Sequence, residues 1–338
     1  MPQRVEYKLH NTLLHSADAV VCIKWVYVMA LCNHGHPISM GPATAPGQPG
    51  PAAANVTNDL SGVRHVIAVV SGKGGVGKSL VSGIIATNLM RAHQRVGILD
   101  ADITGPSIPK MFGLTGKHAT GLGNIMLPQV SKHSIKIMSA NLILKDESDP
   151  VIWRGPILAG AIRQFWEETS WGALDWLVVD MPPGTGDIAL TVFKTLPIEG
   201  VVVVSTPQDL SRMIVGKALK MAELMKIPVL GLVENMSFIT CPCCGTAIEL
   251  FGKSHSDQNA QHFDIPVLGR LGIDPRITQA ADKGKLEEEL PDGLLQGVID
   301  RLQALDGAPQ QSRTMQAQQP AEAASHANQH PTQPPTQA

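Results

Sequence analysis

Aromatic side chains and cysteines are scarce in this chain: only 4% of its 338 residues are aromatic, and it holds five cysteines. A core is nevertheless expected, because 43% of the residues are hydrophobic, and it must consist mainly of Val, Ile, Leu and Ala. Three cysteines fall within four consecutive positions, which indicates metal or redox chemistry in a reducing compartment. A secreted disulfide scaffold is therefore excluded.

The chain also has no large excess of positive or negative charge, since it contains 27 Lys and Arg residues and 29 Asp and Glu residues. The formal net charge of −2 gives the whole chain no attraction to nucleic acid or to anionic membranes. The most apolar stretch near the N-terminus, residues 19–32, includes Lys24 and is shorter than the roughly 20 residues that a membrane helix needs. We expect neither a nucleic-acid nor a membrane partner, and polytopic membrane and collagen-like classes are excluded.

The two ends of the chain differ from its middle. Residues 1–40 form an N-terminal extension for which a secretory signal is one interpretation. Two other interpretations are favoured over a secretory signal: a marginal hydrophobic segment, or an extension upstream of a natural start at Met40. Residues 41–62 are rich in Gly, Pro and Ala and are interpreted as a linker. Residues 306–338 are rich in Gln, Ala and Pro, and we expect a disordered tail there.

Residues 63–305 alternate short β-branched runs with helix-compatible stretches, which predicts one α/β domain with a mostly parallel sheet and helices on both faces. The expected strands are residues 66–70, 96–99, 135–138, 177–179, 201–204 and 229–233, and three of the expected helices are residues 79–93, 158–168 and 211–225.

A phosphate-binding loop is predicted directly after the first strand, where the sequence satisfies G-x-x-x-x-G-K-[ST] and then opens a helix. Its glycines allow backbone N–H groups to face phosphate oxygens, and the helix N-terminus adds positive potential. Lys78 would reach the β- and γ-phosphates, and the Ser79 hydroxyl would bind Mg²⁺. The loop consists of Gly72, Lys73, Gly74, Gly75, Val76, Gly77, Lys78 and Ser79.

Carboxylates end two further strands, at the edge where ligands bind in open parallel sheets. The run Ile98-Leu99-Asp100-Ala101-Asp102 ends the second strand, and Asp180 ends a later one ahead of residues 181–187. A carboxylate in such a place can hold Mg²⁺ or orient an attacking water. Together with the phosphate loop, these positions predict that the chain binds a nucleoside triphosphate.

Cys241 and Cys244 have the C-x-x-C spacing that lets two thiolates converge on one metal or cluster. A redox dithiol and half of a zinc knuckle are the alternatives, and spacing does not distinguish zinc from iron–sulfur. One chain supplies two well-placed thiolates where a closed site needs four, so a symmetric dimer is the economical solution. Cys243 is interpreted as a bystander.

These motifs together resemble the Mrp family of iron–sulfur cluster carrier ATPases, called ApbC in some bacteria. The matching stretches are SGKGGVGKS (71–79), LDADITGPSIPKMFG (99–113), WRGP (153–156), LDWLVVDMPPGTGD (174–187), STPQDL (205–210) and VENMSFITCPCCG (233–245). The resemblance implies a dimeric P-loop NTPase fold of the deviant Walker A class and slow ATP hydrolysis. It also implies a [4Fe–4S] cluster passed to apo-proteins, with cluster assembly scaffolds as further partners, in the cytoplasm.

The resemblance also implies roles for particular residues. Lys73 resembles the signature lysine that reaches the nucleotide of the partner subunit, and Asp102 the switch aspartate that positions water. Asp180 matches the Walker B carboxylate that holds Mg²⁺. The nucleotide base would be contacted by Asn235 and by the Pro207-Gln208 pair. A cluster bridging two subunits would be bound by Cys241 and Cys244.

Leu80 departs from the family pattern, which usually has Thr there and hence one more hydroxyl near the phosphates. A MinD- or ParA-like spatial-regulator ATPase is the alternative function, but it would need a basic or amphipathic tail that residues 306–338 lack. A nitrogenase-iron-protein-like reductase would use two well-separated cysteines per subunit instead of C-x-x-C. Six histidines are expected at the surface or in loops: His65, His93, His118, His133, His255 and His262.

Overall fold

The computed structural model describes residues 62–103, 105–122, 125–143, 155–208, 211–252 and 254–307. The predictions made for residues 1–40, for nearly all of the linker and for residues 308–338 lie outside these ranges, as does the first half of the WRGP stretch. Within them, no helix is both long and apolar enough to cross a bilayer.

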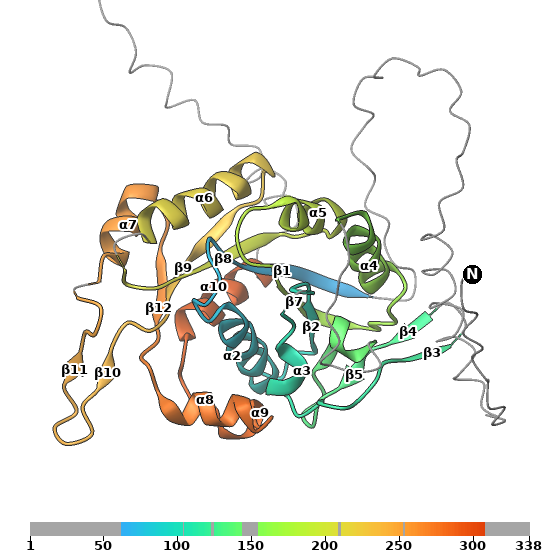
Figure 1. The fold of residues 1–338 in the computed structure, drawn as a ribbon, viewed down its shortest axis with the longest axis horizontal. Helices are drawn as coiled ribbons and strands as arrows, with labels where there is room; N and C mark the ends of the chain where they lie inside the picture. Colours follow the sequence, from blue (N-terminus) through green and yellow to red (C-terminus); the bar gives the residue numbers. More distant parts are fainter. Residues whose placement is uncertain are drawn as a thin grey trace, which may run out of the picture.

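The centre of the molecule is an eight-stranded sheet in the order β12-β9-β8-β1-β7-β2-β6-β5. Figure 1 shows this sheet between two layers of helices. All neighbouring strands pair in parallel except β5, which is antiparallel to β6. Two small antiparallel pairs, β3 with β4 and β10 with β11, lie outside this sheet. The strands are β1 (Val63–Ser71), β2 (Val96–Asp100), β3 (Thr120–Leu122), β4 (Ile125–Leu127), β5 (Gln129–Val130), β6 (Lys136–Ser139), β7 (Leu174–Asp180), β8 (Gly200–Ser205), β9 (Val229–Glu234), β10 (Ile239–Thr240), β11 (Ala247–Ile248) and β12 (Val267–Arg270).

Helices cover both faces of the sheet, as a parallel sheet of continuous apolar strands requires. They are α2 (Lys78–Arg91), α3 (Ile108–Met111), α4 (Gly155–Glu167), α5 (Asp187–Thr195), α6 (Ser211–Leu224), α7 (Ser256–Phe263), α8 (Pro275–Asp282), α9 (Leu286–Glu289) and α10 (Gln296–Asp306), with a 3₁₀ turn at Ala140–Leu142. The three predicted helices correspond to α2, α4 and α6. The α/β prediction is confirmed.

Two apolar clusters fill the space between the sheet and its helices. Alternate side chains of β1 point to opposite faces, so Ile67 and Val69 join one cluster while Val66 and Ala68 join the other. The first cluster packs against α2, α8, α9 and α10, and the second against α4, α5 and α6, which lie on opposite sides of the strands in Figure 1. This packing fixes the carboxyl ends of β1, β2, β7, β8 and β9 along one edge.

Candidate nucleotide and cysteine sites

The phosphate loop connects the end of β1 to the start of α2. Gly75 and Gly77 have φ angles of +79° and +81°, and Gly77 is the N-cap of α2 in the left-handed conformation. These angles favour glycine because a Cβ atom is strained there. The loop is also tied to the segment after β7, since the N–H of Gly184 donates to the Ser71 carbonyl at 3.0 Å.

Asn235, directly after β9, contacts this loop. Its Nδ2 donates to the Val76 carbonyl at 2.9 Å, and its side chain is 4% exposed. A Cβ atom on Gly77 would lie 2.1 Å from that same Nδ2. The glycine is thus required by the neighbouring amide as well as by its own backbone angle, and the sequence-predicted Asn235 does lie beside the phosphate loop.

Lys78, Ser79 and Asp180 meet at the start of α2, as the sequence predicts. The Lys78 ammonium donates to Asp180 Oδ1 at 2.8 Å, and the Ser79 hydroxyl donates to Asp180 Oδ2 at 2.6 Å. Asp180 is fully buried, and the Ser82 hydroxyl, one turn into α2, also donates to its Oδ1 at 2.8 Å. A buried carboxylate paired with one ammonium and two hydroxyls has the partners that its burial demands.

Three carboxylates surround the single Lys78 ammonium. Asp102 Oδ2 lies 3.9 Å from Lys78 Nζ, and Asp100 is fully buried beside the two other aspartates. Burial first, and then the charge of Asp180, raise the pKa of Asp100 from its usual range to about 8. With Asp100 mostly protonated at neutral pH, Asp102 and Asp180 still exceed the single Lys78 ammonium in charge, which favours a bound cation. The adjacent Ser79 hydroxyl and Asp180 carboxylate are hard oxygen donors, so the residues present fit Mg²⁺.

Asp100 also holds the segment that carries Asp102. Its Oδ1 accepts the N–H of Asp102 at 3.2 Å, and its Oδ2 accepts from Ile108, at the start of α3, and from the Ser139 hydroxyl. Asp102 is thereby kept near Lys78 at the carboxyl edge of the sheet.

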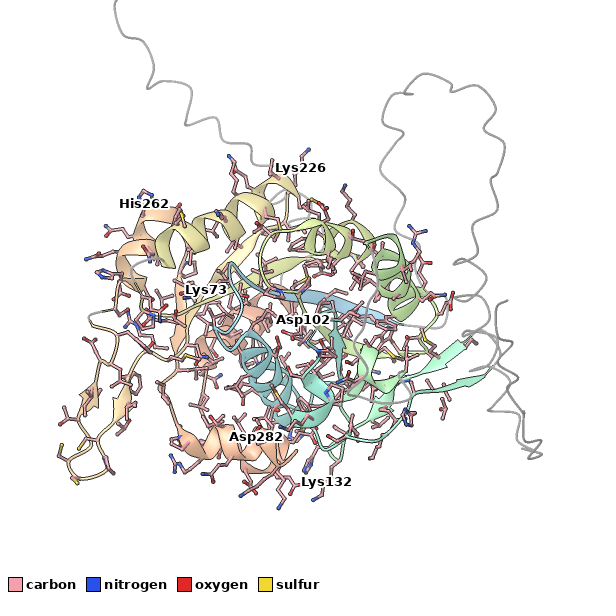
Figure 2. All side chains as sticks on the ribbon, in the orientation of Figure 1. Lys73, Asp102, Lys132, Lys226, His262 and Asp282 are labelled. Atoms are coloured by element: carbon pink, nitrogen blue, oxygen red, sulfur yellow. The ribbon has the colours of Figure 1, made fainter. Side chains whose placement is uncertain are left out.

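Lys73 and Pro207 lie where the chain after β8 meets the phosphate loop. The Lys73 ammonium donates to Gln208 Oε1 at 2.6 Å, and this hydrogen bond is exposed to solvent. Figure 2 labels Lys73 and Asp102 in the central part of the view, whereas Lys226 and Lys132 lie at its periphery. Pro207 is buried beside this contact. The structure therefore places Gln208 beside Lys73, and the contact of Gln208 with a nucleotide base stays a prediction.

Leu80 occupies the position where the resemblance implies a hydroxyl. Its side chain is partly buried and packs against the apolar cluster that α2 shares with α8, α9 and α10. An apolar side chain is accommodated there because it packs against this cluster.

The cysteine pair lies in the turn between β10 and β11. Figure 1 shows this hairpin projecting from the body of the molecule beside β12. Cys241 is half-buried and Cys243 and Cys244 are exposed, and all three are free thiols. The turn is closed by hydrogen bonds from the Cys241 N–H to the Thr246 carbonyl and from the Gly245 N–H to the Cys241 carbonyl, both at 2.9 Å.

The Cys244 thiol has a lowered pKa. Its Sγ lies 3.3 Å from Thr246 Oγ1, and this hydroxyl is the main cause, followed by the Thr246 backbone N–H and the Cys241 thiol. The two thiols of the C-x-x-C pair therefore lie within reach of each other. Neither of them is at the N-terminus of a helix, where a thioredoxin-type dithiol would be found. Across the described residues, no group of three or more His, Cys, Asp or Glu side chains forms a metal site.

Sequence reasoning overlooked several polar residues and misplaced one histidine. Ser82 and Glu234 were assigned no role, because a single polar residue in an apolar run carries no motif. His65 is fully buried instead of lying at the surface. Its ring stacks on Trp176, with centroids 4.4 Å apart, and its nitrogens contact Glu199 and Asp306 at 2.9 and 3.0 Å, which satisfies both ring nitrogens.

A phosphate loop between β1 and α2, with carboxylates at the ends of β2 and β7, defines a nucleotide-binding P-loop NTPase. The family model ParA, described as NUBPL iron-transfer P-loop NTPase, matches residues 62–301, and the chain belongs to this family.

Curated relatives agree with this assignment. The chain is 44% identical over 253 residues to the iron-sulfur cluster carrier protein of Clostridium perfringens, which covers 73% of this chain and 89% of the relative. It is 41% identical over 249 residues to the cytosolic Fe-S cluster assembly factor Nubp2 homolog of Anopheles gambiae, covering 72% and 96% of the two chains.

Solved structures share the fold. A nucleotide-binding protein from Archaeoglobus fulgidus in complex with ADP is 41% identical, with a TM-score of 0.61 over 68% of this chain and 90% of that one. The cell division ATPase MinD of Pyrococcus furiosus has a TM-score of 0.52 over 71% and 99% of the two chains. Its identity is only 17%, so it shows a common fold and nothing more specific.

Proposed function

We propose that this protein is an ATP-hydrolysing carrier that holds a [4Fe–4S] cluster between two copies of the chain and transfers it to apo-proteins. The observation that carries this function is the presence, in one chain, of a phosphate site and a C-x-x-C pair on a projecting hairpin, in which Cys241 is half-buried and Cys244 is exposed and has a lowered pKa. The iron-sulfur carrier names of relatives that are more than 40% identical support the same conclusion.

The phosphates of ATP would bind to the backbone N–H groups of residues 72–79 and to the Lys78 ammonium. Ser79 and Asp180 would hold Mg²⁺, which neutralises phosphate charge when bound. Asp102 lies 3.9 Å from Lys78 and would orient the water whose oxygen attacks the γ-phosphorus, while the bond to the bridging oxygen of ADP breaks.

Two copies of the chain would complete both sites. The Lys73 ammonium reaches an exposed position, where it would stabilise charge on the phosphates of the partner's nucleotide. Cys241 and Cys244 from each copy would supply the four thiolates that a [4Fe–4S] cluster requires. The cluster is cargo, so thiols on an exposed hairpin suit both its loading from an assembly scaffold and its release to an apo-protein. A cytoplasmic location belongs to this proposal and is supported by the name of the cytosolic relative.

Anaerobic reconstitution with iron and sulfide tests this function. We expect about four irons per dimer with an iron–sulfur absorbance band, and loss of both in Cys241→Ala and in Cys244→Ala. Cys243→Ala is the matched control and should retain the cluster, because residue 243 is outside the C-x-x-C pair. Zinc in place of iron, or no metal in the wild type, would refute the carrier function and leave a P-loop ATPase whose output is conformational, as in the MinD-like alternative.

A further inference from the structure

A buried carboxylate lies at the base of the cysteine hairpin. Glu234 is the last residue of β9 and is only 1% exposed. Its Oε2 accepts a hydrogen bond from the Ser237 hydroxyl at 2.7 Å, and its Oε1 accepts from the Ser254 hydroxyl at 2.8 Å and from the Ser256 hydroxyl. Among the residues that the structure describes, Arg270 is the cation paired with this carboxylate, and its Nε lies 3.7 Å from Oε2.

The serine donors come from both ends of the segment that carries the cysteines. Ser237 precedes β10, and Ser254 and Ser256 follow β11, so one carboxylate joins the two ends of the hairpin. Such joining restricts how the hairpin is oriented, since the charge-assisted hydrogen bonds from Ser254 and Ser256 must both break before the two ends separate. The same base is held by backbone hydrogen bonds from Ser237 to Leu271 and from Ile273 to Phe238.

The neighbouring residue connects the same strand end to the nucleotide site. Asn235 donates through Nδ2 to the Val76 carbonyl of the phosphate loop, and its Oδ1 accepts the N–H of Met236 at 2.9 Å. Met236 has a φ of +59°, so the turn after Asn235 is held in a conformation that non-glycine residues seldom adopt. Two adjacent side chains at the end of β9 thus fix the phosphate loop and the base of the cysteine hairpin.

We propose that Glu234 is a positioning residue that orients the Cys241–Cys244 hairpin and, through its neighbour Asn235, couples that hairpin to nucleotide bound at the phosphate loop. This inference rests on the proposed function, in which the hairpin carries the cluster and the loop binds ATP. Movement of the phosphate loop would displace Asn235, and the shared turn would transmit the displacement to the carboxylate that joins the hairpin ends.

Alkylation of the full-length protein by iodoacetamide tests this coupling without requiring a cluster. The rates at Cys241 and Cys244, read by peptide mass spectrometry, are compared with and without ATP and Mg²⁺. In the wild type we expect ATP to change the rates by at least about threefold. In Glu234→Gln the rate without ATP should rise about fivefold or more, and the ATP effect should disappear, because the joined ends are released.

Matched variants separate positioning from a general loss of structure. Glu249→Gln removes the same charge from the exposed part of the hairpin and should behave as the wild type. Ser254→Ala should share the behaviour of Glu234→Gln in weaker form, and Ser254→Thr, which keeps the hydroxyl, should restore the wild-type response. These two serine variants decide the matter if Glu234→Gln does not fold.

Two results would overturn the coupling: wild-type alkylation that ignores ATP, or Glu234→Gln and Ser254→Ala proteins that respond to ATP as the wild type does. Failure of the proposed function would give a different result from both of these: the wild-type protein would take up no cluster in the reconstitution experiment. An ATP-dependent alkylation that requires Glu234 would stand even then.

Discussion

Single Gly→Ala replacements in the phosphate loop should lower the free energy of unfolding by different amounts, and the structure predicts their order. Gly74→Ala should cost little, because the added Cβ would lie 3.9 Å from its nearest neighbour, Pro183 Cβ. Gly75→Ala meets no atom within 4 Å but has a φ of +79°, which costs about 1–2 kcal/mol. Gly77→Ala has the same strain and would also place its Cβ 2.1 Å from Asn235 Nδ2.

In Gly77→Ala the Asn235 amide must move away from the Val76 carbonyl. Loss of this buried hydrogen bond adds about 1–3 kcal/mol to the cost of the backbone strain. The total for Gly77→Ala is about 2–5 kcal/mol in the free energy of unfolding, measured by urea denaturation. The double variant Gly77→Ala/Asn235→Ala has no clash, so its loss should be smaller than the sum of the single losses by at least about 1 kcal/mol. Equal losses for Gly75→Ala and Gly77→Ala, or additivity in the double variant, would refute this reasoning.

Three further predictions concern the carboxylates and Lys73. Asp102→Asn should lower kcat for ATP at least about tenfold with little change in KM, because it removes the group that orients water; a wild-type kcat in a phosphate-release assay would remove Asp102 from this role. If Lys73 acts on the nucleotide of a partner subunit, the rate of ATP hydrolysis per chain should rise with protein concentration as dimers form. Lys73→Ala should abolish this rise, whereas Lys217→Ala, a control on α6, should not. The raised pKa of Asp100, about 8, means that the folded state holds its proton more tightly than the unfolded state. The contribution of this group to stability is therefore fully present below about pH 4 and is lost as the pH rises through about 8. Urea denaturation at pH 6 and pH 9 should show a smaller loss on alkalinisation in Asp100→Asn than in the wild type, and an equal loss in both would contradict the assignment.

The central sheet was predictable because its strands are continuous apolar runs. Residues 201–204 are four valines, all buried in β8, and the phosphate-loop motif follows β1 directly. Parallel pairing then places Asp100 and Asp180 side by side, and the register confirms that they are partners on neighbouring strands. The approach of Lys78 and Ser79 to Asp180 follows from the same topology, so the nucleotide site was largely readable from the sequence.

Other features depend on contacts that leave no local pattern. β5, β10 and β11 have two residues each, too few for any periodicity to appear. The burial of His65 depends on Glu199 and Asp306, which lie 134 and 241 positions away in the sequence. A motif search recognises the stretch that contains Glu234, but it does not indicate that serines on both sides of the hairpin converge on this carboxylate.

The end of β9 is where the two halves of the proposed function meet. Five parallel strands bring Ser71, Asp100, Asp180, Ser205 and Glu234 to one edge, and four of these strand ends lead into segments around the nucleotide site. Among the strands that the structure describes, β9 continues into both sites, since Asn235 packs on the phosphate loop and the chain then enters the cysteine hairpin. A nucleotide can influence a distant metal site only through an element with different free energies in the two states. The Glu234-Asn235 pair is the shortest covalent connection between these sites, so an effect of ATP on the thiols has to be looked for there first.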